Sequence, residues 1–404
     1  MMDAERHKPT HDQLKLSIRM PGSDHPLSLT RILVFGLVAA AFTNIYITQP
    51  VLPVLASEFG IDAAQASLTV SMTVLGIALS TLIFGSLGDR YPLRPLILTG
   101  GTMVALAGLL AAGTASFSIL VAARFVQGLF IPALTTCVAA YLANNVSRAD
   151  LNVALGAYVS ATVVGGLGGR LLGGFLHPPL HWRYAFVSAA LLLAAATFAA
   201  ARWLPGVTAR PQHAEGGIGF RTLLASGKVL RMYVVGFGAF WVFSTTFNFL
   251  PFHLAAPPIS ASTGLITLLY MAYLVGAVMG PLSGRLANRF GSGRTMVIGA
   301  LLFEISLAGL LVPSIPMVVI ALLGSCAGFF TTHAAATGAL NNRLSSSRGR
   351  GNALYVLFYY VGGAVGITAS GYAWRLGGWE TVLGLNALVL TIPLVVGLYE
   401  MRKK

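Results

Sequence analysis

A few ionisable side chains lie in stretches of this sequence that are otherwise almost entirely apolar. Arg124 and Arg170 each lie inside a hydrophobic run, as do Glu304 and His333 later in the chain. An ionised group in such a setting is costly and normally faces a partner or a water-filled cavity. A guanidinium there can bind an anion. Histidine titrates near neutral pH, so His333, and alternatively Glu304, is a candidate proton carrier.

The two arginines are expected at one depth on consecutive antiparallel helices. Each lies six residues from one end of its run, which at about 1.5 Å per residue is ~9 Å along the helix. The first six runs contain no Asp or Glu except Glu58 at the edge of the first run. We therefore hypothesise a cavity that prefers a substrate with a negative group. The alternative is that both guanidiniums hydrogen-bond to backbone carbonyls, Gln127 or Tyr158, or reach towards water.

Further polar side chains cluster on three other runs. Pro50 and Pro251 interrupt the first and seventh runs, and proline frees a carbonyl and allows a bend where a helix lines water. The side chains near these prolines, the hydroxyls of the eleventh run and the glutamine beside Arg124 are therefore candidates to line a cavity: Asn44, Tyr46, Gln49, Gln127, Asn248, Tyr355 and Tyr359.

The composition predicts an all-α integral membrane protein. Of 404 residues, 56% are apolar and only 9% are charged, and the mean hydropathy is +0.77, which a water-exposed surface cannot carry. A spanning helix needs about 20 apolar residues. Twelve such runs lie near 31–56, 67–87, 95–114, 118–143, 151–176, 183–204, 229–253, 261–284, 295–313, 315–341, 351–374 and 379–399.

Basic residues are distributed on one side of these runs. If the N-terminus is cytoplasmic, the 26 Lys and Arg residues all fall in cytoplasmic segments except Arg183 and Arg375 in opposite loops and Arg124 and Arg170 within runs. An excess of Lys and Arg marks the cytoplasmic side of a membrane protein. We therefore expect both termini in the cytoplasm. The formal net charge of +14 then needs no nucleic-acid partner.

The sequence indicates no cofactor, metal site or catalytic centre. Cys137 and Cys326 fall inside predicted spans, so neither a disulfide framework nor a zinc site is expected. No phosphate-binding loop of the P-loop type occurs, which argues against a primary pump, and no His or acidic residues cluster as in a membrane enzyme. The first apolar run is too long for a signal peptide. Residues 1–28 are expected to form a disordered cytoplasmic tail.

The sequence also repeats itself. The segment from Gly85 to Arg94, GSLGDRYPLR, follows the second run, and the segment from Gly284 to Arg294, GRLANRFGSGR, follows the eighth at the same relative position. Self-similarity in register indicates a duplication. We expect two pseudo-symmetric six-helix bundles, 29–204 and 229–399, joined by a cytoplasmic linker at 205–228 and followed by a short tail at 400–404.

The repeated segment resembles the loop between spans 2 and 3 of the major facilitator superfamily, in which a glycine is followed after three residues by Asp-Arg and then by a basic residue. Pro92 here replaces a usual glycine, and Asn288 replaces the aspartate in the second copy. In that family the cluster stabilises the outward-open state. The resemblance implies a conformational latch, with simple topology signals as the alternative: Gly85, Asp89, Arg90, Arg94, Gly284, Arg289 and Arg294.

Two more segments resemble this family. Arg124-Phe-Val-Gln127-Gly128 is similar to its Arg-x-x-Gln-Gly segment near the central cavity. The glycines of the fifth run resemble the glycine motif of its drug and proton antiporters, although Arg170 replaces the proline of that motif. Small residues three and four apart let two helices approach closely in lipid. We expect tight packing or a hinge at these glycines: Gly156, Gly165, Gly169, Gly173 and Gly174.

The resemblance implies a monomeric secondary transporter of the bacterial inner membrane that works by alternating access. Its main expected activity is proton-coupled efflux (antiport) of a drug or metabolite. Drug-efflux relatives usually place an acid in the first run, and this chain has none there. The tenth run lines the cavity by resemblance, so His333 is the preferred proton site, with an ordinary interior histidine as the alternative. Uptake of a small organic anion and a non-transporting sensor stay open as other functions.

Overall fold

The computed structural model describes residues 27–146, 148–204, 219–344 and 348–402. Within these ranges the chain is almost entirely helical and contains no β-strand, so the expected all-α class is confirmed. Most of the expected N-terminal tail (1–28), residues 205–218 of the expected linker and residues 403–404 lie outside the described ranges.

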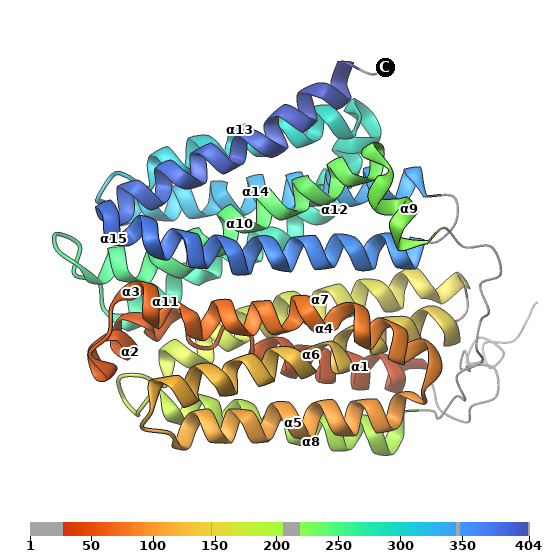
Figure 1. The fold of residues 1–404 in the computed structure, drawn as a ribbon, viewed down its shortest axis with the longest axis horizontal. Helices are drawn as coiled ribbons and strands as arrows, with labels where there is room; N and C mark the ends of the chain where they lie inside the picture. The colour runs from red at the N-terminus through yellow and green to blue at the C-terminus, as the bar shows by residue number, and fades with distance from the viewer. Residues whose placement is uncertain (1–26, 147, 205–218, 345–347, 403–404) are drawn as a thin grey trace, which may run out of the picture.

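The helices form two halves that lie side by side with roughly parallel axes (Figure 1). The first half consists of α1 (Leu27–Thr43), η2 (Gln49–Val51), α2 (Leu52–Phe59), α3 (Ala63–Ala66), α4 (Leu68–Arg90), α5 (Leu93–Gly113), α6 (Phe117–Asn145), α7 (Arg148–Phe175) and α8 (Arg183–Trp203). The second half consists of α9 (Phe220–Ala225), α10 (Gly227–Ala255), α11 (Thr263–Leu269), η3 (Tyr270–Leu274), α12 (Val275–Phe290), α13 (Ser292–Gly309), α14 (Ile315–Arg343) and α15 (Arg348–Arg402).

The element α15 contains two helices joined at a sharp reversal. Gly377 and Gly378 have non-helical backbone angles, and Gly378 has a φ of 63° and a ψ of −146°, a conformation that only glycine adopts readily. The two arms of α15 therefore run in opposite directions (Figure 1). The reversal lies in the interval that the sequence places between its last two apolar runs.

Nine helices in the described part of the chain are long and apolar enough to span a membrane, and α1 is a shorter apolar helix. The sequence predicts twelve apolar runs, and three structural features account for the difference. A break at residues 44–48 shortens α1, Arg294 and Glu304 lower the hydropathy of α13, and α15 counts once although it contains two helices.

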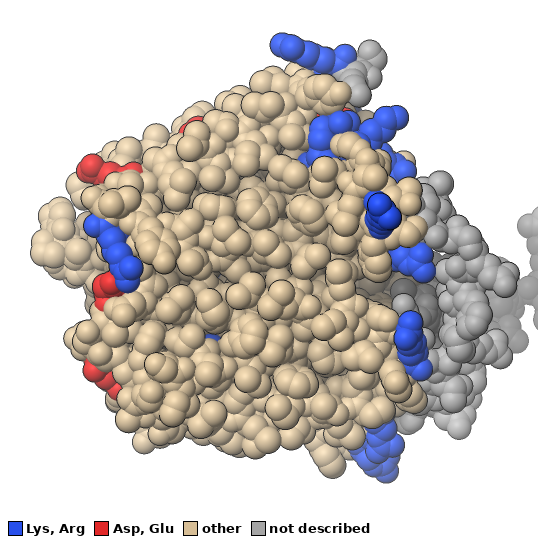
Figure 2. Space-filling view, in the orientation of Figure 1, with Lys and Arg blue, Asp and Glu red and all other residues tan. Residues whose placement is uncertain are grey.

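Large apolar side chains cover the outside of both halves. Ile305, Val278 and Leu388 expose 70%, 66% and 65% of their surface, which is favourable in lipid and costly in water. Figure 2 shows an almost uncharged band between two ends. Most Lys and Arg side chains gather at the end where α15 finishes, called here the basic end. The opposite end, where Figure 1 labels α2 and α3, carries Glu58 of α2 and Asp62 before α3 and is called the acidic end.

Three glycines of α7 allow it to pack directly on the backbone of the first segment. A Cβ atom on Gly165, Gly169 or Gly173 would lie 2.2, 2.1 or 1.9 Å from a carbonyl oxygen, far inside van der Waals contact. The carbonyls concerned are those of Ala39, Thr43 and Ile47. The expectation of tight packing thus holds for these three positions, whereas a Cβ on Gly156 would have no atom within 4 Å.

The second half repeats this contact. A Cβ on Gly362 of α15 would lie 2.3 Å from the carbonyl oxygen of Phe237 of α10, and one on Gly366 would lie 2.7 Å from the Trp241 ring. Gly362 and Gly366 follow Gly165 and Gly169, respectively, by 197 residues in the sequence. The two pairs therefore occupy similar contacts, between α7 and α1 in the first half and between α15 and α10 in the second. Gly174 differs, because a Cβ there would meet the Thr267 hydroxyl of the other half at 1.8 Å.

The contact of α7 with α1 makes Gly169→Ala a destabilising substitution. The added methyl would collide with the Thr43 backbone, and overpacking of this kind costs about 1–3 kcal/mol. We expect a lower midpoint of thermal unfolding in detergent. Gly156→Ala, on the same helix but in open space, is the control and should leave the midpoint unchanged. Equal effects of the two variants would contradict the assigned packing.

Candidate binding site between the two halves

The first membrane segment is broken near the middle of the molecule. α1 ends at Thr43 and η2 begins at Gln49, and residues 44–48 between them are not helical. Pro50 lies in the first turn after the break, where its missing N–H leaves a carbonyl of the break without a helical donor. The non-helical stretch itself also leaves the Asn44 and Ile45 carbonyls without a backbone donor among the described residues, and such carbonyls inside a membrane need other donors.

Arg124 of α6 supplies these donors. Its Nη1 donates to the Asn44 carbonyl at 2.6 Å and its Nη2 to the Ile45 carbonyl at 2.5 Å. Its Nε donates to the Thr69 carbonyl of α4 at 2.9 Å. The side chain is fully buried. Arg124 therefore holds the broken segment against α4.

Gln127, one turn along α6, completes this network. Its Oε1 accepts a second hydrogen bond from Arg124 Nη1 at 2.5 Å. Its Nε2 donates to the Val104 carbonyl at 3.1 Å and to Asn44 Oδ1 at 3.3 Å. The predicted cavity residues Asn44, Arg124 and Gln127 thus contact one another, but their polar atoms are directed at the protein. The contacts favour the alternative in which Arg124 binds backbone carbonyls.

Arg170 has a different environment from that of Arg124. Its Nε donates to Gln49 Oε1 at 2.8 Å and its Nη1 to the Gly166 carbonyl of its own helix at 2.8 Å. The guanidinium carbon lies 4.2 Å from the centre of the Tyr46 ring, 4.7 Å from that of Tyr273 and 5.4 Å from that of Tyr270. Arg170 therefore reaches from the first half into a cage of tyrosines, two of which belong to the second half.

No carboxylate compensates this charge. Arg170 is 2% exposed, and none of the ion pairs formed among the described residues includes it. An unpaired buried charge costs several kcal/mol, and a desolvated cation on an aromatic face recovers up to about 2 kcal/mol. The three rings thus offset a large part of the free-energy cost of burying the guanidinium, which still has no anionic partner among the described residues.

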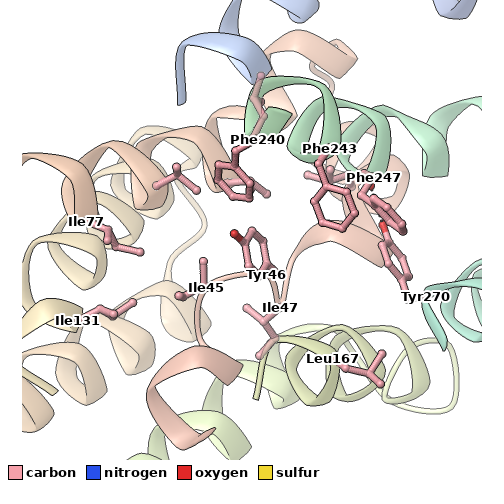
Figure 3. Packing of buried hydrophobic residues seen from close by; sticks show 14 of the residues in the cluster. Ile45, Tyr46, Ile47, Ile77, Ile131, Leu167, Phe240, Phe243, Phe247 and Tyr270 are labelled. Carbon is pink, nitrogen blue, oxygen red and sulfur yellow. Dashed lines mark hydrogen bonds between the residues drawn. The ribbon is translucent and has the colours of Figure 1, made fainter. Parts of the chain in front are cut away.

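Aromatic rings of the second half surround the tyrosine cage. Phe240 stacks on Tyr359 with ring centres 3.7 Å apart, and Phe243 stacks on Phe329 at 4.0 Å. Figure 3 shows Tyr46 of the first half beside Phe240 and Phe243 of α10. The predicted residues Tyr46, Gln49, Arg170 and Tyr359 therefore belong to one region between the halves.

His333 lies at the edge of this aromatic region. Its Nδ1 is 2.9 Å from the Tyr355 hydroxyl, and its ring lies 5.3 Å from Tyr359 and 5.7 Å from Phe329. Glu304 is on α13, and no hydrogen bond or ion pair connects its side chain to this region among the described residues. Of the two candidate proton sites, only His333 is part of the central group.

Asn248 connects the two halves at a separate point. Its Nδ2 donates to the Ser67 hydroxyl, which immediately precedes α4, at 2.7 Å. Its Oδ1 is buried and has no hydrogen-bond partner. Asn248 therefore joins the halves without contacting Arg170.

Several residues of the site were not singled out from the sequence. Tyr270 and Tyr273 contact Arg170, and Phe240, Phe243 and Phe247 line α10 beside them. Their spacings of three and four residues place each set on one helical face. That periodicity was available in the sequence, but it does not distinguish a binding wall from an ordinary core.

The predicted latch residues lie at the basic end. Arg90, Arg94, Arg289 and Arg294 are exposed, and no ion pair of the described side chains joins them to the other half. Arg289 lies over the ring of its neighbour Phe290 at 5.2 Å. Gly85 and Gly284 have no close neighbour across the halves. The side chain of Asp89 lies outside the described set.

An ion pair between the halves is instead found at the acidic end. Arg375 of α15 forms an ion pair with Asp62 at 2.7 Å, and Asp62 also caps α3 by accepting from the Gln65 N–H at 2.7 Å. Gly371 packs against Ala64 beside this pair. Burial acts to raise the pKa of Asp62, but the hydrogen bonds from Gln65 and Arg375 outweigh it and lower the pKa.

Removal of Arg124 should destabilise the fold more than removal of Arg170. Arg124→Met leaves three carbonyls and the Gln127 oxygen without their donor, at about 1–3 kcal/mol for each buried group left unsatisfied. Arg170→Met leaves the Gly166 carbonyl and the Gln49 Oε1 without the hydrogen bonds that Arg170 donates to them. We expect a clearly lower midpoint of thermal unfolding for the first variant. A larger loss for Arg170→Met would contradict the assigned roles.

The pair Asp62–Arg375 should favour closure of the acidic end. Asp62→Asn removes an exposed ion pair, worth about 0.2–1 kcal/mol, and spin labels on α3 and α15 should report longer distances. Because the pKa of Asp62 is lowered, the contribution is complete above the ordinary pKa of aspartate and is lost only as the pH falls below it.

Glu58→Gln is the control for this substitution. Glu58 accepts from Trp182 and Arg183, which belong to its own half, so its loss should not change the distance between the halves. An unchanged distance in Asp62→Asn would show that the pair does not contribute to closure.

Sequence comparisons identify one family over most of the chain. The sequence profile of the Major Facilitator Superfamily matches residues 34–256 and 254–403. The chain is 28% identical over 401 residues to the inner membrane transport protein YnfM of Escherichia coli (strain K12), covering 96% of this chain and 95% of that protein. It is 30% identical over 275 residues to a chloramphenicol resistance protein of Streptomyces lividans, covering 66% of this chain and 68% of that protein.

Solved structures with low sequence identity share the fold. A bacterial homologue of the human lysosomal transporter Spinster, in an inward-facing and unoccupied conformation, gives a TM-score of 0.75 at 15% identity and covers 94% of this chain and 97% of its own. The nucleoside transporter NupG, as a point mutant, gives 0.74 at 14% identity, covering 91% and 99%. Together with the profile match, these findings show that the chain belongs to the major facilitator superfamily.

Proposed function

We propose that this protein is a secondary transporter of the bacterial inner membrane that exposes a central site to each side in turn. The observation that carries the proposal is the buried group around Arg170, in which side chains of both halves surround one charge. Membership of the superfamily supports it, as does the similarity to YnfM, an inner membrane transport protein. In this proposal the protein lies in the lipid bilayer as a monomer, and it transports a small solute coupled to protons.

The proposal includes twelve crossings in two pseudo-symmetric six-helix bundles. The chain through α1, η2 and α2 makes one crossing, as does the chain through α11, η3 and α12, and α15 supplies two. The equivalent glycine contacts of Gly165 with α1 and of Gly362 with α10 support the symmetry. The excess of Lys and Arg at the basic end supports a cytoplasmic location for that end and for both termini.

In this orientation the described conformation is closed towards the periplasm. The ion pair Asp62–Arg375 and the contact of Gly174 with Thr267 join the halves there. The latch residues Arg90 and Arg94 are exposed on the cytoplasmic side and have no ion pair across the halves among the described side chains. We infer that they act in the opposite, outward-open conformation.

Proton-coupled efflux is the activity that we propose first. His333 is the protonatable side chain within the central aromatic group, and its hydrogen bond with Tyr355 would change when a proton is taken up. The similarity to a chloramphenicol resistance protein supports export of a drug. Uptake of an organic anion is the alternative, favoured by the uncompensated Arg170. A sensor without transport activity is the third candidate.

Liposomes containing the purified protein test both transport and coupling. Under an imposed pH gradient, we expect protein-dependent flux of at least one solute in a set that includes chloramphenicol and anionic, neutral and cationic compounds, accompanied by proton movement. His333→Gln should lower gradient-driven flux by about tenfold, the effect of losing about 1.4 kcal/mol of coupling, and should spare exchange without a gradient.

Glu304→Gln is the matched control, because Glu304 lies on α13 away from the central group. Its gradient-driven flux should equal that of the unmodified protein. If Glu304→Gln abolished coupling and His333→Gln did not, the assigned proton site would be wrong. If no solute crossed in any liposome sample, the sensor would replace the transporter.

A further inference from the structure

We infer that the site at Arg170 binds a singly charged organic anion, with a carboxylate as its charged group and a planar or apolar body. The inference rests on the proposed function, because it specifies the class of solute that the central site would accept. Three properties of the site lead to it: the kind of polar atoms present, the number of available charges and the side chains that surround them.

The polar atoms available at Arg170 include two hydrogen-bond donors without an acid beside them. The guanidinium has no carboxylate partner, as described above. Gln49 is fully buried and its Oε1 already accepts from Arg170 Nε at 2.8 Å, which fixes the orientation of the amide. The Gln49 Nε2 is therefore a donor, and it has no hydrogen-bond partner. A buried donor beside an uncompensated cation is complementary to an oxyanion.

The number of charges limits the ligand to one negative group. Arg124 donates four hydrogen bonds to carbonyls and Gln127, so only one of the two buried guanidiniums faces the interface between the halves. A dianion would bring a second charge into a region in which Arg170 is the permanent cation among the described side chains, since His333 is charged only when it holds a proton. Burial of an unpaired charge would oppose its binding.

The surrounding rings suit a planar or apolar body. Tyr46, Tyr270 and Tyr273 present their faces to Arg170, and the stacked pair of Phe240 and Tyr359 lies beyond them. Aromatic rings favour offset stacking on other rings. A carboxylate that binds Arg170 would replace the tyrosine faces as its partner. Because two of these tyrosines belong to the second half, binding would loosen a contact that holds the halves together.

Four compounds that share one benzene ring but differ in charge test the inference: benzoate with one negative charge, phthalate with two, neutral benzamide and cationic benzylamine. Binding to the purified full-length protein in lipid nanodiscs is measured by the shift in its thermal unfolding midpoint and by equilibrium dialysis. Two larger monocarboxylates, 1-naphthoate and indole-3-acetate, extend the apolar body. We expect at least one monocarboxylate to bind, and phthalate, benzamide and benzylamine to bind at least about tenfold more weakly.

Gln49→Glu is the most informative variant. It places a carboxylate against Arg170 without removing the arginine, so the internal pair should preserve the fold and abolish binding of the anion. Arg170→Gln should also abolish binding, whereas Arg170→Lys should retain a weakened affinity because the charge remains. Arg221→Gln is the control, since Arg221 is exposed on α9 at the basic end, and its affinity should not change.

The inference is overturned if phthalate, benzamide or benzylamine binds as well as the monocarboxylates, if Gln49→Glu retains anion binding, or if none of the three monocarboxylates binds. Flux measurements in liposomes distinguish a failure of this binding inference from a failure of the proposed transport function. Protein-dependent flux of only neutral or cationic solutes would leave a transporter with a different substrate class. Binding of a monocarboxylate at Arg170 without any flux would leave the site and remove the transport proposal.

Discussion

The hydrogen bonds from Arg124 to the broken first segment are the interaction on which the centre of this molecule depends. A break inside a membrane frees carbonyls that no water can satisfy, and one guanidinium supplies donors to two of them and to the neighbouring α4. The segment can therefore leave the helical path between Thr43 and Gln49. That departure directs Tyr46 and Gln49 towards Arg170.

The glycines of α7 also determine where Arg170 lies. Because Gly165, Gly169 and Gly173 carry no side chain, α7 lies directly on the carbonyls of the first segment. Arg170 follows the middle glycine of this row, so its side chain leaves α7 beside the break and passes to the interface. Close packing and the position of the charge therefore have a common origin. In lipid such packing is a main source of helix association, because burial of apolar surface gives little net gain there.

The two ends of the molecule differ in how they join the halves. At the acidic end small residues and the pair Asp62–Arg375 join α3 and α15. At the basic end no ion pair among the described side chains joins the exposed arginines to the other half. Between the ends, Arg170 of the first half contacts Tyr270 and Tyr273 of the second, and Tyr46 of the first half lies beside Phe240 and Phe243 of the second (Figure 3).

The sequence by itself determined the helical fold class, the membrane environment, the repeated segments and the one-sided distribution of charge, since these follow from composition, run length and repeated spacing. It also identified Arg124, Arg170, Tyr46 and Gln49 as polar residues near the centre. Only the tertiary structure decided that Arg124 binds the backbone while Arg170 faces the other half. Equal depth along two helices does not specify their rotation, and rotation decides which partner each guanidinium meets. The tyrosines of η3 could not be assigned to the site from the sequence for a similar reason. A helical periodicity defines a face but not the helix that the face will meet.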